Sequence, residues 1–168
     1  TLKETNAEAV SDQLSAMGIR RIGAFHHEAR RLKDGHILVL ASVEQVMDGV
    51  QSDGPVDILG DTILLLDGNL QVVWAWDAFD HLDVTRKATM DDGCSPGACP
   101  PLFLATEAND WLHGNALAVT PDGNLLYSLR NQDWVIKIDF ENGFGNGDVL
   151  WRLGQGGDFA LTATDPQP

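Results

Sequence analysis

The sequence predicts an all-β fold built from units of four short antiparallel strands, the arrangement of the blades in a β-propeller. Short apolar or alternating runs are separated by Asp-Gly turns, and glycine makes up 17 of the 168 residues. The pattern also repeats, because the turn at Asp34-Gly35 corresponds to the turn at Asp122-Gly123. We therefore expect the chain to cover roughly two to three blades of such a fold.

Residues 19–77 form the first predicted blade. Its run HILVLASV is almost continuously apolar, which suits a strand that is covered on both faces. The segment 45–60 separates this run from the next one and is predicted to be a loop. The four predicted strands are residues 24–32, 36–43, 61–66 and 71–77.

Residues 110–159 form the second predicted blade. In the turn TPDGN, at 120–124, proline presets φ and Asp-Gly supplies the reversal of the chain. The four predicted strands are residues 115–119, 125–130, 134–139 and 148–153. Alternation along the first of them should point His113, Asn115, Leu117 and Val119 to one side.

Three further segments lie outside these two units. Residues 1–18 are predicted to contain a short amphipathic helix, with Ala9, Val10, Leu14 and Met17 as its apolar positions and Gly18 at its end. Residues 78–109 are too long for an ordinary connection and are predicted to be an inserted loop that walls a site. Residues 160–168 are expected to be a truncated tail.

Composition excludes several classes of function. The formal net charge is −14, from 25 acidic and 11 basic residues, which argues against nucleic-acid binding and against attraction to anionic lipid. No apolar run is long enough to span a membrane. The two cysteines, Cys94 and Cys99, permit a small disulfide loop in an oxidising compartment, or they remain free thiols. Without a nearby histidine they do not suggest a zinc site, and no other metal site is predicted.

The hairpin at 113–130 carries the candidate site. Its second strand returns beside the start of the first, so Arg130 is expected near His113 and Asn115. Arginine offers a planar fork of donors, and histidine donates or exchanges a proton near neutral pH. Together these three side chains would make a receptor for a tetrahedral oxyanion. The alternative is that the histidine is a structural residue of the strand.

Several spaced motifs here resemble one family. DWLHGN, then a strand ending in SLR, then VIKID and VLWRLG, resemble the arylsulfotransferase (aryl-sulfate sulfotransferase) family over residues 25–159. The resemblance implies a six-bladed β-propeller that moves a sulfuryl group from a phenolic sulfate ester to a phenol. It also implies a covalent sulfohistidine, no nucleotide or other cofactor, and a periplasmic or secreted location, where a disulfide between the two cysteines would be favoured.

The resemblance also assigns roles to residues. It implies that His27, His113, Asn115 and Arg130 are catalytic, with Arg130 clamping sulfuryl oxygens. The blade register places His27 opposite Asn115, and this favours His27 over its neighbour His26, which is kept as a substrate contact. Trp111 is expected either to wall the acceptor pocket or to pack between blades.

The sequence departs from the family pattern in one respect. The family's nucleophilic histidine lies downstream of the W-x-L-G strand, but no histidine follows His113. We therefore expect the nucleophile to lie outside this chain and the chain alone to be inactive. Its expected partners are an aryl sulfate donor, a phenolic acceptor, and the remainder of the propeller or a second copy. Two other hypotheses stay open, namely a non-catalytic propeller segment that binds a ligand or partner, and a metal-dependent propeller hydrolase.

Overall fold

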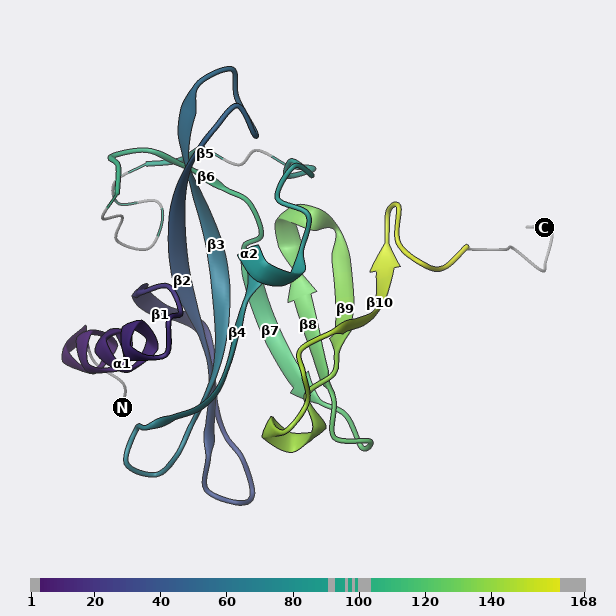
Figure 1. The fold of residues 1–168 in the computed structure, drawn as a ribbon. Coiled ribbons are helices and arrows are strands. Elements are labelled where there is room, and N and C mark those ends of the chain that lie inside the picture. The colour runs from purple at the N-terminus through teal and green to yellow at the C-terminus, as the bar shows by residue number, and fades with distance from the viewer. Residues whose placement is uncertain (1–3, 91–92, 96, 98, 100–103, 161–168) are drawn as a thin grey trace.

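The computed structural model describes residues 4–90, 93–95, 97, 99 and 104–160. Most of the ordered elements are strands, and they form two sheets that lie side by side (Figure 1). Leucine, isoleucine and tryptophan side chains from both sheets fill one shared core. This confirms the β-rich class that the sequence predicts. No helix in the described ranges is long and apolar enough to cross a bilayer.

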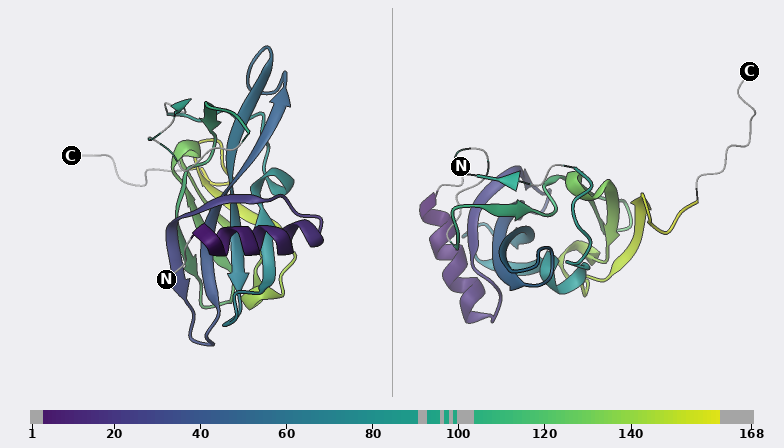
Figure 2. Two further views of the ribbon diagram at one scale, coloured as in Figure 1. Left: turned by 90° about the vertical axis from the view of Figure 1, so that its left-hand side faces the viewer. Right: turned by 90° about the horizontal axis from the view of Figure 1, so that it is seen from above.

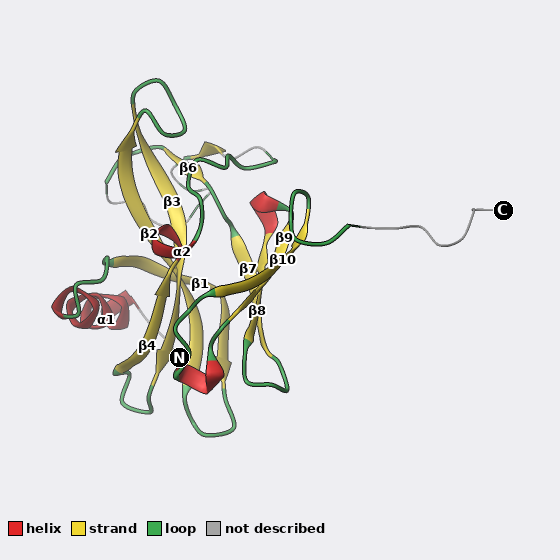
Figure 3. Cartoon of the chain, turned by 45° about the vertical axis from the view of Figure 1, so that its right-hand side comes forward, coloured by secondary structure: helices red, strands yellow, loops and turns green. Residues whose placement is uncertain are grey.

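The first sheet contains the four strands predicted for the first unit. They are β1 (Ile22–Arg31), β2 (Ile37–Asp48), β3 (Pro55–Leu66) and β4 (Val72–Asp77), antiparallel neighbours in chain order. Strands β2 and β3 pair over twelve residues each, from Ile37↔Leu66 to Asp48↔Pro55, as a long hairpin (Figure 3).

The predicted loop at 45–60 is therefore wrong over most of its length. Only residues 49–54 connect the two strands. The apolar run ends near Val43, but Glu44 to Asp48 continue to pair with the incoming strand. Ladder hydrogen bonds to a neighbouring strand override weak local propensity, and a single-sequence pattern does not contain that information.

Helix α1 (Glu4–Ala16) confirms the predicted N-terminal helix and crosses the outer face of the first sheet (Figure 2). Its buried apolar positions are Ala7, Val10 and Leu14, which pack with residues of β2 and β3. The predicted contributions of Ala9 and Met17 are wrong, since both are exposed. The spacing 7, 10, 14 keeps one helix face on the sheet, whereas Ala9 points away from that face and Met17 follows the last helical residue, Ala16.

The second sheet contains the four strands predicted for the second unit. They are β7 (Gly114–Val119), β8 (Leu125–Leu129), β9 (Trp134–Ile138) and β10 (Val149–Gly154), again antiparallel neighbours in chain order. Strand β8 ends one residue before its predicted end, because Arg130 opens a short 3-10 helix, η1 (Arg130–Gln132). A second one, η2 (Glu141–Gly143), lies in the connection to β10.

The segment 78–109 is not the plain loop that the sequence predicts. It contains α2 (Ala78–His81), β5 (Gly93–Cys94) and β6 (Ala108–Asp110), and β6 pairs in parallel with β3. Cys94 and Cys99 are joined in a disulfide bond with their Cα atoms 5.7 Å apart, which is the predicted pairing. Strands of two or three residues are too short to leave a periodic pattern, which is why the sequence does not reveal them. Of the predicted tail 160–168, all but residue 160 lies outside the described residues.

Two tryptophans fix the second sheet against the first. The indole Nε1 atoms of Trp74 and Trp76, both on β4, donate to the carbonyl oxygens of Gly145 and Gly147, each at 2.9 Å. Burying these rings contributes much of the core, and the polar end of each indole is satisfied. With the sheets held in this way, β1 and β7, the first strands of the two units, lie next to each other.

Candidate functional site

A bulge interrupts each of the two adjacent first strands. The pairing of β1 with β2 shifts between His26 and Ala29, and the pairing of β7 with β8 shifts between Gly114 and Ala116. Bulges redirect side chains and are common beside active sites. The residues that the sequence register matches, His27 and Asn115, both fall inside these bulges.

The two bulges bring two histidines together. His27 and His113 both have φ of 48°, in the left-handed region that few non-glycine residues adopt. Their imidazole centroids lie 5.0 Å apart with an interplanar angle of 71°. His27 is exposed and His113 is partly exposed, so both rings are accessible from solvent. A strained backbone at two facing residues indicates a functional arrangement, because other interactions must offset its cost.

His113 is backed directly by a carboxylate. Its Nδ1 atom contacts Oδ2 of Asp110, three residues earlier on β6. Burial raises the pKa of the Asp110 carboxyl, and the contact with His113 opposes that rise. A carboxylate accepts hydrogen bonds only, so it favours the proton on Nδ1 of His113. Nε2 of His113 is then left to bind a ligand or exchange a proton.

His27 is backed by a carboxylate through a second histidine. Its Nδ1 lies 3.0 Å from Nδ1 of His26, and Nε2 of His26 lies 2.9 Å from Oδ1 of Asp61. Burial lowers the pKa of His26, but the contact with Asp61, a hydrogen bond with the Ala41 carbonyl and the charge of Asp110 together raise it above its ordinary value. The pKa of His27 is lowered by burial and by the neighbouring His26 and His113.

Asp61 connects the two sheets beneath these histidines. Its Oδ2 accepts hydrogen bonds from the Tyr127 hydroxyl at 2.6 Å and from the backbone nitrogen of Gly114 at 2.8 Å. Tyr127 is fully buried, and burial together with Asp61 raises the pKa of its hydroxyl. A Cβ atom at Gly114 would lie 2.0 Å from Tyr127 Oη. Only glycine therefore allows the backbone to approach this close.

Arg130 and Asn115 lie at the same strand ends, with exposed side chains. The backbone nitrogen of Arg130 donates to the carbonyl of His113 at 3.3 Å, and its Nη1 donates to Asn131 Oδ1 at 3.4 Å. The predicted alternation from His113 is wrong at the bulge: Leu117 is buried in the core whereas Asn115 is exposed. The extra residue of the bulge changes the side to which the following residues point.

Trp111 lies in the core. It is 1% exposed, its Nε1 donates to the Arg86 carbonyl at 2.9 Å, and its ring packs against Phe79 at 5.3 Å. The structure thus places it in one of the two predicted settings, packing. A contact of this indole with substrate stays a prediction.

The remaining two histidines lie elsewhere. His36 Nδ1 lies 3.0 Å from Asp34 Oδ2 in the first hairpin turn, and His81 stacks on Trp76 at 5.0 Å. Burial lowers the pKa of His81. Because they lie away from the pair, His36 and His81 can serve as controls in experiments on His27 and His113.

Sequence reasoning missed Asp61. Asp61 opens the apolar run DTILLL, and a carboxylate at the start of a buried strand needs a partner. That was the available signal. Its partners come from β1, β7 and β8, up to 66 residues away along the chain, so the sequence could not name them.

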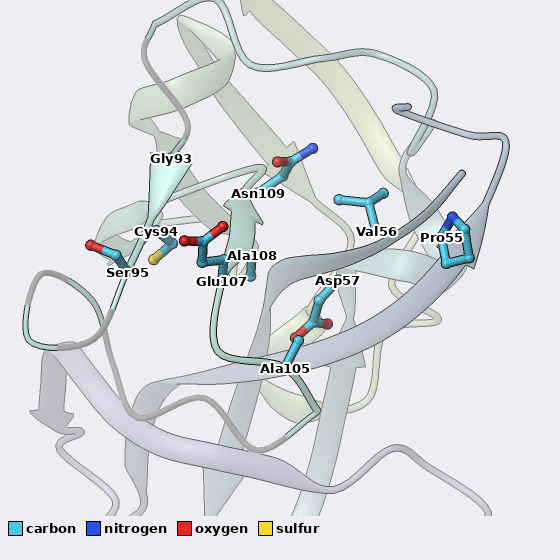
Figure 4. A pocket seen from close by; sticks show the side chains of 10 residues that line it. All are labelled: Pro55, Val56, Asp57, Gly93, Cys94, Ser95, Ala105, Glu107, Ala108 and Asn109. Atoms are coloured by element: carbon cyan, nitrogen blue, oxygen red, sulfur yellow. The ribbon is translucent and has the colours of Figure 1, made fainter. Parts of the chain in front are cut away.

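A hollow lies at β5 and β6 (Figure 4). It has a volume of about 530 Å³, and Asp57, Glu107 and Asn109 are among the residues that line it. Burial raises the pKa of the Asp57 carboxyl, while a hydrogen bond with Glu44 opposes the rise. An acidic lining does not suit an anionic ligand. The histidine pair is therefore the better candidate for binding an anion.

Comparison with known proteins points to one family. The family model described as Arylsulfotransferase (ASST) matches residues 12–166, which is nearly the whole chain. A search of the curated proteins finds no match. The matched range contains both bulged strands, both facing histidines and the carboxylates behind them. The chain belongs to the arylsulfotransferase family.

Proposed function

We propose that this chain carries the anion-binding part of an aryl-sulfate sulfotransferase site. His27, His113, Asn115 and Arg130 would hold the sulfuryl group of a phenolic sulfate ester during its transfer to a phenol. The observation that carries the proposal is the contact of the His27 and His113 imidazoles, 5.0 Å apart at adjacent bulges. Family membership supplies the reaction class.

Sulfuryl transfer would require hydrogen-bond donors from this chain more than chemically reactive groups. The S–O bond to the donor phenol breaks while an S–N bond to a histidine forms, and the acceptor phenol then takes the sulfuryl group from that nitrogen. Negative charge gathers on the sulfuryl oxygens and the departing phenolate, as in phosphoryl transfer. Arg130 would bind two sulfuryl oxygens and Asn115 a third. His113, polarised by Asp110, would donate to an oxygen or take the proton of the acceptor phenol.

The histidine that takes the sulfuryl group is proposed to lie outside this chain. The resemblance set out above puts it on a later strand, and the two sheets would be neighbouring blades of a larger β-propeller. Exposed Leu150 and Leu153 on β10, the last strand of its sheet among the described residues, support a further neighbour there. That neighbour is the rest of the propeller or a second copy of the chain. The disulfide between Cys94 and Cys99 supports a periplasmic or secreted location.

The test uses a chromogenic aryl sulfate with a phenol acceptor. In the protein that includes the remaining propeller, we expect transfer that falls by about two to three orders of magnitude in kcat on His113→Asn. The chain of 168 residues alone is expected to bind the aryl sulfate and to form no sulfuryl adduct on His27 or His113 by mass spectrometry. Full activity in a variant lacking both histidines would refute the proposal.

The same assay separates the rival functions. A non-catalytic binding segment would bind the aryl sulfate without transfer in the longer protein. A metal-dependent hydrolase would lose activity with a chelator and would regain it with a divalent cation. Among the described residues no group of three or more histidine, cysteine or acidic side chains could hold a metal ion, so the structure adds no support for the hydrolase.

A further inference from the structure

We propose that Asp61 is a positioning residue of this site. Through Oδ1 it fixes the protonation and orientation of His26, which contacts His27. Through Oδ2 it fixes the backbone next to His113. The proposal deepens the proposed function and rests on it for its consequence in catalysis. This one buried carboxylate faces both halves of the site.

The Oδ1 atom of Asp61 faces His26. It lies 2.9 Å from Nε2 of His26, and both side chains are shielded, at 5% exposure for Asp61 and 11% for His26. A carboxylate only accepts, so this ion-pair contact favours the proton on Nε2 of His26. The opposite nitrogen of the same ring, Nδ1, then faces His27 Nδ1 at 3.0 Å.

Between two facing nitrogens only one carries the shared proton. When His26 is charged, both of its nitrogens donate, so Nδ1 of His27 accepts and His27 holds its own proton on Nε2. Nε2 of His27 is then a donor for a sulfuryl oxygen. The raised pKa of His26 and the lowered pKa of His27 agree with this order. Asp61 thereby influences His27 without touching it.

The Oδ2 atom of Asp61 faces the second sheet. It accepts from the nitrogen of Gly114, the residue after His113, at 2.8 Å, and from Tyr127 at 2.6 Å. His113 has a left-handed backbone, and this hydrogen bond on its neighbour holds the bulge in place. Because β3 supplies Asp61 while β7 supplies Gly114, the carboxylate also sets how closely His27 and His113 approach.

Other titratable groups lie near the same rings. Asp110 on β6 faces His113 and adds a weaker attraction to the charged form of His26. His113 lies on the other side of His27 and, with His26, disfavours a charge on it. Tyr127 on β8 stays protonated because its pKa is raised by burial. None of these groups contacts Nε2 of His26, and besides Asp61 the backbone carbonyl of Ala41 also raises the pKa of His26 through a hydrogen bond.

The experiment measures nitrogen protonation in the whole chain rather than activity. Imidazole ¹⁵N shifts of His26 and His27 are recorded against pH for the wild type and Asp61→Asn. In the variant the carboxamide oxygen should keep accepting from Tyr127 and Gly114, so its NH₂ group faces His26. Nε2 of His26 should change from protonated to unprotonated near neutral pH. Its titration midpoint should fall by on the order of one pH unit, and the Overhauser contact between the His27 and His113 rings should weaken.

The matched control is Asp77→Asn. Asp77 is a buried carboxylate on the neighbouring strand, opposite Thr62, and accepts from Arg20 at 2.8 Å. Loss of this carboxylate should lower stability and leave the His26 midpoint unchanged. If Asp61 had only a structural role, Asp61→Asn would give the same result. Tyr127→Phe keeps the proposal testable if Asp61→Asn does not fold. With one donor fewer on Oδ2, the Asp61 carboxylate should attract the charged form of His26 more strongly, and the His26 midpoint should rise.

The outcomes are separable. A folded Asp61→Asn or Tyr127→Phe protein whose His26 midpoint and Nε2 protonation equal those of the wild type would overturn the proposal. In the longer protein, Asp61→Asn should lower kcat with little change in KM. Absence of transfer by the wild type would overturn the proposed function, whereas the His26 titration alone decides whether Asp61 positions the ring.

Discussion

A histidine with a left-handed backbone lies in or directly before the bulged first strand of each sheet, but different contacts hold the two rings. His113, directly before the first strand of the second sheet, contacts its carboxylate, Asp110, within three residues of sequence. His27 in the first sheet reaches Asp61 only through His26. The direct pair holds one ring by a local contact. The relayed pair depends on how two sheets pack, so it couples the site to the interface between them.

The largest expected effect is on the directly held ring. His113→Asn should lower kcat in the longer protein by about two to three orders of magnitude, because a donor to the developing oxyanion is lost. His27→Asn should lower kcat by less, because His26 shares the function of His27. Steady-state rates with a chromogenic aryl sulfate measure both variants. Equal losses would show that the two rings have the same function and would remove the contrast.

Gly114→Ala should disrupt the close approach of the Gly114 backbone to Tyr127, next to His113. The new methyl group would lie 2.0 Å from Tyr127 Oη, which bonds to Asp61. Overpacking of this kind costs about 1–3 kcal/mol in the free energy of unfolding. Chemical denaturation measures it, with Gly68→Ala as a control at an open turn position where a Cβ meets nothing. A Gly114→Ala protein as stable as the control would contradict the described packing.

Tyr127→Phe isolates the link between the sheets. It removes one hydrogen bond to the buried Asp61 without changing the ring. Hydrogen bonds to charged groups contribute about 1.5–3 kcal/mol, so unfolding should become easier by roughly that amount. The change should be seen in the denaturation midpoint with an unchanged slope. No change would mean that the Asp61 contacts do not hold the sheets together.

The smallest expected effect is a dependence of stability on pH. The folded pKa of His26 is raised, so its contribution to stability is complete below the unfolded pKa, about 6.5, and is lost as pH rises through the folded pKa. His27 has a lowered pKa and acts in the opposite sense, costing stability as pH falls below about 6.5. The wild type should therefore exceed Asp61→Asn in stability by more at about pH 6 than at about pH 9. A constant difference between the two would contradict the raised pKa of His26.

The sequence predicted what short-range chemistry determines. The Asp-Gly turns set the hairpins, and both four-strand units lie where the turns and apolar runs placed them. His27, His113 and Arg130 were named from motifs and register, and the structure puts the two histidines in contact. The long β2–β3 hairpin and the pairing of β6 with β3 were missed because they depend on distant partners. Asp61 was missed for the same reason, since its partners belong to other strands.

The central claim is that His27 and His113 form one site for a sulfuryl group. The most direct measurement follows all five histidine imidazoles by NMR while an aryl sulfate is added, with the corresponding phenol as the control ligand. We predict that His27 and His113 shift together with one dissociation constant, that the phenol reproduces little of this change, and that His36 and His81 stay constant. Shifts at His36 or His81 alone, or none at His27 and His113, would contradict the account.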